Sequence, residues 1–422
     1  MKYFRIVFAF LCMLVFEAGG CAKHSLERVP SSSNNKLLIP APATADQVIP
    51  TIRPALIIPL EPARTPGVAA HEEPTGNDSG VSNDAAAVVH DRAVLTEDTV
   101  LKGSVLIKGY LVVAPQATLR IEPGTIIRFA AVGAGKNAAR LVVQGRIIAV
   151  GTAESPIVMT SDRKRPARGD WGGVSLVSSE KRNQLEHCRI EYANSAIEAQ
   201  FSTVSLKNVA VSWSHTAFLM RDTVVQMAGG SVSESETGIE MHDSEFDAVD
   251  ITVSDCKRGI VMNRSAASVS SVQIRNNQQY GILADDCRIR ITSGELSGNG
   301  NGASFKGGEG QIVATSFSAN RETALNLTGA RIKVNRCRFF NNGKDALRLE
   351  DGRALLWGNV FEANKGFNLY NAGREDIGAL QNWWGSSDPA AISQKIHDAV
   401  SDPRSGSVHV FPWLNEKPAF LR

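Results

Sequence analysis

The segment FFNNGKDALRL, residues 339–349, returns in outline as FEANKGFNLYN, residues 361–371. In both segments a phenylalanine is followed by Asn, Gly and an apolar residue in the same order. The anchor position recurs toward the N-terminus at intervals of 21 or 22 residues, as Ile190, Val211, Val232, Val253, Ile274, Leu296, Phe317, Phe339 and Phe361. Nine copies at a fixed period predict a solenoid in which each copy forms one coil.

Two further apolar positions repeat with the anchor. Five residues before it stand Leu206, Met227, Ala248, Val269, Ile291, Ile312, Val334 and Leu356. Seven or eight residues after it stand Ile197, Phe218, Ile239, Ile260, Ile282, Leu325, Leu347 and Leu369. Short strand-forming segments separated by tight turns predict an all-β fold, a right-handed parallel β-helix of about a dozen coils.

A leucine-rich repeat has a similar spacing and is the competing solenoid. It needs an apolar residue five positions after the anchor, to fill the inside of its horseshoe. This chain has Ser195, Thr216, Thr237, Arg258, Gln279, Asn301, Glu322, Lys344 and Gly366 there. None of these is apolar, and the anchors are mostly Val, Ile and Phe, which favour strands. We therefore reject the leucine-rich repeat.

Asparagine occupies the third position after the anchor in the later coils. Equivalent side chains of successive coils stack ~4.8 Å apart, and an Asn side chain both donates and accepts. A column of Asn can therefore hydrogen-bond along its length inside a turn. The predicted ladder contains Asn277, Asn299, Asn320, Asn342 and Asn364, with a structural role.

Four cysteines lie within the repeat, at positions 188, 256, 287 and 337. Cys188 and Cys337 share a column but lie seven coils apart, or ~34 Å. A disulfide needs Cα atoms within ~7 Å, and Cys256 and Cys287 fall at different corners. We therefore predict four buried thiols and no disulfide.

Less regular coils precede the repeat, with the phrases GTAESPIVMTS, GDWGG and LEHCRIEYA. Together with the repeat they resemble the bacterial right-handed parallel β-helix lipoproteins of the pectin-lyase-like class, over about residues 96–416. The resemblance implies a β-helix over 96–380 and a cap over 381–422. In the cap, Asp388 is expected to N-cap a helix beginning at Pro389. Trp383, Trp384 and Trp413 are expected to close the open end of the solenoid.

The N-terminus predicts export. MKYFR carries two positive charges and Ile6–Phe16 is apolar, a layout typical of a signal peptide over residues 1–20. The next residue, Cys21, follows small residues and resembles a lipobox, although Glu17 and Ala18 depart from the usual pattern. An ordinary signal peptide with a chance Cys is the alternative. Lipidated Cys21 would anchor the chain in a membrane, and Ala22 favours the bacterial outer membrane by resemblance to lipoprotein sorting.

Residues 21–95 contain nine of the 17 prolines and no lasting apolar period, which predicts an extended linker. The whole chain has 45 Lys plus Arg against 43 Asp plus Glu. This balance gives no indication of nucleic acid as a partner.

The 21-residue period also brings polar residues of successive coils into columns. Two positions after the anchor stand Tyr192, Trp213, Glu234, Asp255 and Asn276. Two positions further on stand Asn194, His215, Glu236 and Lys257. Aromatic side chains beside carboxylates predict a sugar-binding surface, and carboxylates ~5–10 Å apart suit glycosidase chemistry. A solvated turn explains the same residues without any function.

Three other features are weaker. Asp285–Asp286 and Arg331–Lys333 (RIK) resemble parts of polygalacturonase sites, but the Gly-His-Gly of that family is missing, so we interpret them as coincidence. Acidic residues between Glu234 and Asp250 could hold Ca²⁺, but they lack a fixed ligand spacing. No metal or other cofactor is predicted. The basic segment DRKRPARGD, residues 162–170, is expected to be a surface loop.

The class that the chain resembles includes polysaccharide lyases, hydrolases and epimerases, and members without known activity, so fold alone leaves function open. We favour a non-enzymatic envelope protein that contacts polysaccharide through Tyr192, Trp213, His215 and Asn276. The alternatives are a polysaccharide lyase or glycosidase using Glu234, Glu236 or Asp255, and a scaffold for an envelope protein.

Overall fold

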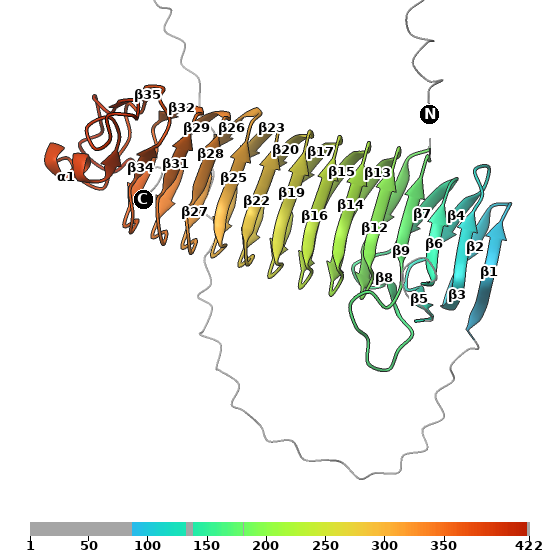
Figure 1. Cartoon of the computed structure of the whole chain (residues 1–422). Coiled ribbons are helices and arrows are strands. Elements are labelled where there is room, and N and C mark those ends of the chain that lie inside the picture. The colour runs from blue at the N-terminus through green and yellow to red at the C-terminus, as the bar shows by residue number, and fades with distance from the viewer. Residues whose placement is uncertain (1–86, 132–137, 180, 420–422) are drawn as a thin grey trace, which may run out of the picture. The chain divides into compact units, whose positions relative to one another are not determined.

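The computed structural model describes residues 87–131, 138–179 and 181–419. These residues form a parallel β-solenoid of about 13 coils, with 37 strands and one short helix. Figure 1 shows the coils following one another along the axis in chain order, so that each coil contacts mainly the next. The predicted signal peptide, Cys21 and the predicted linker up to residue 86 lie outside the described residues.

Each coil passes through three parallel faces, which we call A, B and C in the order of the chain. Face A contains β6 (Arg140–Val143), β9 (Gly173–Val177), β12 (Ser195–Gln200), β14 (Thr216–Arg221), β16 (Thr237–His242), β19 (Arg258–Asn263), β22 (Tyr280–Asp285), β25 (Asn301–Lys306), β28 (Leu325–Thr328), β31 (Leu347–Glu350), β34 (Leu369–Asn371) and β36 (Ile396–His397).

Face B contains β2 (Thr99–Leu101), β4 (Thr118–Ile121), β7 (Arg146–Val150), β10 (Asn183–Glu186), β17 (Glu245–Val249), β20 (Ala266–Ser270), β23 (Arg288–Thr292), β26 (Glu309–Val313), β29 (Arg331–Asn335), β32 (Arg353–Trp357), β35 (Ile377–Gly378) and β37 (Val408–His409).

Face C contains β5 (Ile126–Phe129), β8 (Ile157–Ser161), β11 (Cys188–Glu191), β18 (Thr252–Ser254), β21 (Gln273–Arg275), β24 (Glu295–Ser297), β27 (Ser316–Ser318), β30 (Arg338–Phe340) and β33 (Val360–Glu362). Four longer strands turn a corner: β1 (Val88–Leu95), β3 (Ser104–Val113), β13 (Thr203–Ser212) and β15 (Val224–Ser233). Because β1 already pairs with β3, paired strands begin before residue 96, the predicted boundary. The prolines that suggested a linker end at Pro74, well before β1.

The predicted anchors form the core. All nine are buried, and strand pairing places them in register from coil to coil, as between Ile190 and Val211 and between Phe339 and Phe361. In the later coils the anchor rings stack with centroids 5.0 Å apart between Phe317 and Phe339 and 4.9 Å apart between Phe339 and Phe361. The period of the sequence is therefore the period of the coils, as predicted.

The asparagine ladder is present as predicted. The side-chain amide of Asn277 donates to Oδ1 of Asn299 at 2.9 Å, and the same bond links each later pair down to Asn364. A second, shorter ladder that the sequence analysis missed joins Asn359 to Asn382, at 3.0 Å. Both ladders satisfy backbone groups at buried corners, where an unpaired group would cost stability.

The C-terminal end is closed partly as expected. Helix α1 (Pro389–Gln394) is capped by the Asp388 carboxylate, which accepts from the amides of Ala390 and Ala391. Trp384 is buried and continues the phenylalanine stack, its ring lying 4.7 Å from that of Phe361. Trp413 packs against the core with partial burial. Within the described part of the chain, no helix has the length and apolar character needed to span a bilayer.

The four cysteines of the repeat are buried free thiols, and burial raises their pKa values, to about 12 for Cys188 and Cys337 and to about 11 for Cys256. Since the thiolate is the reactive form, we expect alkylation of Cys188, Cys256 and Cys337 in the native protein at pH 8 to be at least about 100-fold slower than that of a free cysteine. Peptide mass mapping after alkylation, with and without denaturant, measures this. Fast labelling of the native protein, or thiols that stay unlabelled after unfolding without reductant, would contradict it.

Candidate functional site

The column predicted as a sugar-binding surface lies at the corner where face C leads into face A of the next coil. Tyr192, Trp213, Glu234, Asp255 and Asn276 all have positive φ angles, between 50° and 63°. This left-handed backbone is the reason for the sharp turn, and it directs the side chains outward. The Trp213 side chain is 43% exposed, and Asp255 and Asn276 are exposed. The structure thus brings the five residues together along one convex edge.

The basic loop between β8 and β9 folds over this corner. Figure 1 shows a long loop that extends beyond the regular turns beside β8. The buried Asp170 carboxylate shapes the loop, because it accepts from the Ser161 hydroxyl at 2.7 Å and the Ala167 amide at 2.9 Å. The expectation of a plain surface loop was therefore incomplete, since sequence periodicity gives no information about where an insertion returns.

Arg168 of this loop reaches the candidate residues. Its guanidinium lies 5.4 Å from the centre of the Trp213 ring, and its Nε donates to the Glu234 carbonyl at 3.1 Å. A Cβ atom placed on Gly169 would come within 2.8 Å of His215 Nε2, so the loop backbone lies directly against that ring. The loop thus occupies space next to the Trp213 face on which a sugar would stack.

In the second predicted column, Asn194, His215, Glu236 and Lys257, only the two middle residues contact each other. His215 Nδ1 lies 3.2 Å from a Glu236 carboxylate oxygen, whereas Asn194 and Lys257 are exposed. Glu234 lies 3.9 Å from Arg168, so two of the three candidate catalytic carboxylates face a basic side chain. The corner can bind polar groups, but it has the convex form of a turn.

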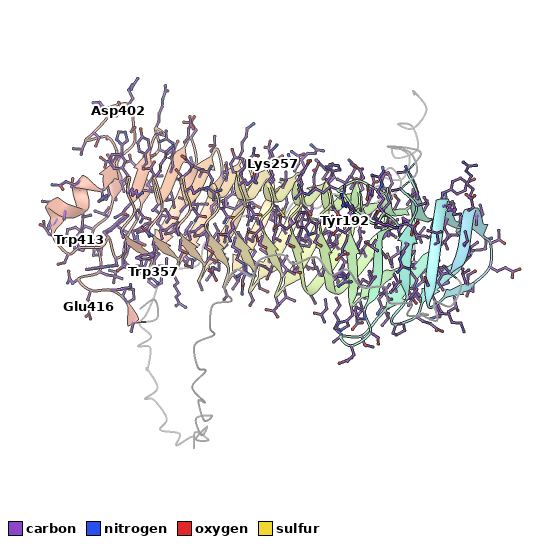
Figure 2. The ribbon with its side chains drawn as sticks, turned by 90° about the horizontal axis from the view of Figure 1, so that it is seen from below. Tyr192, Lys257, Trp357, Asp402, Trp413 and Glu416 are labelled. Carbon is purple, nitrogen blue, oxygen red and sulfur yellow. The ribbon has the colours of Figure 1, made fainter. Side chains whose placement is uncertain are left out.

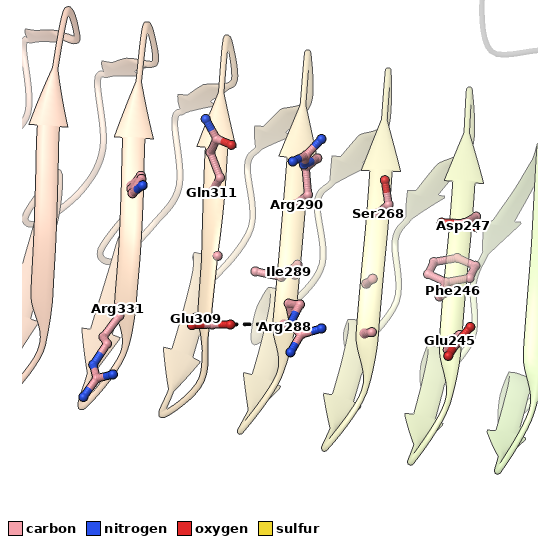
Figure 3. Close-up of a pocket in the computed structure, with 14 residues that line it drawn as sticks. Glu245, Phe246, Asp247, Ser268, Arg288, Ile289, Arg290, Glu309, Gln311 and Arg331 are labelled. Atoms are coloured by element: carbon pink, nitrogen blue, oxygen red, sulfur yellow. Dashed lines mark ion pairs between the residues drawn. The ribbon is translucent and has the colours of Figure 1, made fainter. Parts of the chain in front are cut away.

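A groove that the sequence analysis missed lies on face B. It has a volume of about 680 Å³ and runs over β17, β20, β23, β26 and β29. Figure 3 shows its outward side chains in two rows, one with Glu245, Arg288, Glu309 and Arg331 and the other with Asp247, Ser268, Arg290 and Gln311. The small side chains of β20, Ala266 and Ser268, make the hollow in the otherwise continuous wall.

The groove is acidic at β17 and basic from β23 onward. Arg288 pairs with Glu309 at 3.4 Å, as the dashed line in Figure 3 marks. The side chains of Arg290, Arg331 and Lys333 make no ion pair or hydrogen bond with any residue that the structure describes. Three unpaired cations on β23 and β29, two coils apart, give this part of the groove a positive potential.

A second hollow of about 480 Å³ extends the groove toward the N-terminal coils. It shares Asp247 and Ser268 with the first and reaches Arg182, which donates to Gln226 at 2.6 Å. A third hollow joins Asp286 to Arg331 across the corner between faces A and B. Face B is therefore hollowed along the axis of the solenoid for several coils.

The signal for the groove was present in the sequence but was interpreted differently. Ile332 of RIK is buried as predicted, while Arg331 and Lys333 point outward into the groove. The matching segment RIR, residues 288–290, lies two coils earlier at the same positions of the coil. The recurrence of Arg-Ile-Arg and Arg-Ile-Lys at the outward positions of face B is the sequence signal for the groove.

No three His, Cys, Asp or Glu side chains come together as a metal site within residues 87–131, 138–179 and 181–419. The acidic residues between 234 and 250 diverge: Glu240 faces His242 and Asp243 binds Arg264, while Glu245 and Asp247 line the groove. Their placement gives no support to the Ca²⁺ hypothesis, which stays untested.

Comparison with known families gives two matches within the described solenoid. Residues 93–200 match a pectate-lyase-like beta helix domain, and residues 258–382 match a right handed beta helix region. The chain is a right-handed parallel β-helix repeat protein. The handedness and repeat predicted from the sequence are thereby confirmed.

Solved structures similar to this β-helix are distant in sequence. A mutant of the periplasmic alginate epimerase AlgG is 11% identical, with a TM-score of 0.48 over 74% of this chain and 78% of that one. The A-module of the Azotobacter vinelandii mannuronan C-5 epimerase AlgE4 is 10% identical, with a TM-score of 0.41 over 71% and 91%. Tailspike protein 3 of bacteriophage CBA120 is 11% identical, with a TM-score of 0.38 over 78% and 56%. A search of curated proteins finds no match.

Proposed function

We propose that this β-helix is a non-catalytic protein of the bacterial envelope that binds an acidic polysaccharide along face B. The observation that supports it most is the set of unpaired cations Arg290, Arg331 and Lys333 in an open groove. A groove that follows the solenoid axis suits a linear polymer. Ser268 and Gln311 beside the cations supply hydrogen-bonding groups for sugar hydroxyls.

Anchoring to the membrane is part of the same proposal and is supported by the sequence alone. Lipidated Cys21 would hold the chain on the outer membrane, and the Pro-rich linker would carry the β-helix away from it. Such a tether places the groove within reach of envelope glycans.

The double substitution Arg290→Ala plus Lys333→Ala tests the binding site. We expect it to weaken binding of polygalacturonate about 10-fold or more at low salt, because both charges face the ligand. Added salt should weaken binding to the natural protein as well. Isothermal titration calorimetry measures both effects.

Lys257→Ala is the matched control, since Lys257 is an exposed cation at the corner away from face B. Figure 2 shows Lys257 and Trp357, which lies on face B, at opposite edges of the solenoid. Equal weakening by Lys257→Ala, or equally tight binding of neutral dextran, would contradict a specific acidic groove. If the protein binds an acidic envelope protein and no glycan, the scaffold function is favoured.

Cleavage of polysaccharide at the corner is the second candidate, because Glu234 and Asp255 hold equivalent turn positions of successive coils there, next to the His215–Glu236 pair. If it is correct, the protein releases reducing or unsaturated ends, and Glu234→Gln removes that activity while Arg290→Ala leaves it. Stable polysaccharide over long incubation would reject this function.

A further inference from the structure

Large apolar side chains are exposed on the C-terminal coils of face B. Trp357 is 48% exposed, Leu380 is 38% exposed and Phe411 is 74% exposed. Leu355, two residues before Trp357 on the outward face of β32, is 53% exposed. Burial in the core therefore does not explain these side chains, and exposed apolar clusters of this kind mark interaction sites.

Strand register places three of these residues in one column. Leu355 pairs with Gly378, and Gly378 pairs with His409. Two residues after these pairs stand Trp357, Leu380 and Phe411, the last two just beyond the ends of β35 and β37. The Phe411 ring is backed by Trp413, with ring centres 5.5 Å apart. We call Trp357, Leu380 and Phe411 the aromatic platform.

In the four coils before the platform the same column holds smaller side chains, Ser270, Thr292, Val313 and Asn335. Asn335 pairs with Trp357, and Lys333 pairs with Leu355, so the platform begins one coil after the last cation of the groove. From Arg290 to the coil of Phe411 there are five steps of ~4.8 Å, or ~24 Å in all. The groove and the platform thus form one strip along the axis.

An occupant of this strip needs charged groups at one end and apolar faces at the other. A chain of acidic sugars offers both, because each ring has a carboxylate at its edge and C–H groups on its face, which pack on aromatic rings. A straight polymer that lies over Arg290 and Lys333 continues over Leu355, with Trp357 beside it at the next outward position of β32. Continuity with the basic groove therefore favours the same polysaccharide as the occupant.

We propose that the aromatic platform is a stacking subsite for the acidic polysaccharide that binds the groove. This inference rests on the proposed function. It predicts that chain length determines affinity: oligomers longer than ~24 Å reach both parts, whereas shorter oligomers bind the groove alone.

The experiment compares a short and a long oligogalacturonate by calorimetry, on the full chain and on Trp357→Ala, alone and combined with Phe411→Ala. The double variant should bind the long oligomer about 10-fold more weakly and the short one as before, since only the long oligomer reaches the two rings. Phe201→Ala is the control, because Phe201 is an aromatic side chain of similar exposure, 57%, in an early coil. Circular dichroism checks that each variant is folded.

The outcomes are distinct. The stacking subsite is wrong if the natural protein binds the long oligomer no tighter than the short one, or if the platform variants bind both oligomers normally. In either case, binding of acidic glycan in the groove is not contradicted. If the natural protein binds neither oligomer, the proposed function fails as well. Vesicles of phosphatidylethanolamine and phosphatidylglycerol form a separate arm: binding to them that disappears in the double variant would assign the platform to lipid and overturn the proposal.

Discussion

Phe339→Ala is expected to lower the free energy of unfolding by about 3–5 kcal/mol, the usual range for truncating a fully buried phenylalanine. Phe339 has no exposed surface, and its ring stacks on both Phe317 and Phe361. The substitution removes the middle ring of a continuous stack, and the rigid coils on either side cannot close the gap. Urea unfolding followed by circular dichroism measures the loss.

Phe340→Ala is the matched control, because the adjacent side chain points outward. Its ring lies 4.6 Å from the Arg338 guanidinium on the surface. Loss of that contact should cost at most about 1 kcal/mol. Similar losses in the two variants would show that residues 339 and 340 do not alternate between core and surface, and would contradict the strand register.

Asn320→Leu is expected to lower stability by about 3 kcal/mol, the second large effect. Asn320 Oδ1 accepts from the backbone amide and the side-chain amide of Asn299, and its own amide donates to the Leu296 carbonyl and to Asn342. Leucine leaves at least two buried donors of Asn299 unpaired, at about 1–3 kcal/mol each.

Asn335→Leu makes the same chemical change on face B. The Asn335 side chain is partly exposed and is not part of either asparagine ladder. It should change the urea midpoint little, as surface substitutions usually do. If Asn320→Leu behaved in the same way, the hydrogen-bonded ladder would contribute no net stability.

The core could be predicted because each coil repeats the same geometric requirement. Ile190, Val232 and Phe339 must all fill one interior column, so their apolar character returns with the period of the coil. Asn320 and its neighbours repeat for the same reason, since each corner has to satisfy the same backbone groups. The second ladder was missed because Asn359 and Asn382 give only two copies, too few to make a period.

The sites were harder to predict because outward side chains have no common requirement. On face B one column changes from Asp247 to Ser268, Arg290, Gln311 and Lys333, so no periodic signal marks it. The corner column was noticed because its aromatic and acidic residues are conspicuous. The contact of Arg168 with Trp213 depends on how an irregular loop folds back, which coil spacing does not determine.

Binding of an acidic glycan on face B is the central claim, and a crystal structure of the protein with a long oligogalacturonate tests it most directly. The account predicts sugar carboxylates within hydrogen-bond distance of Arg290 and Lys333, with the chain running along the axis toward Trp357. A ligand stacked on Trp213 beside Glu234, with face B empty, would contradict it.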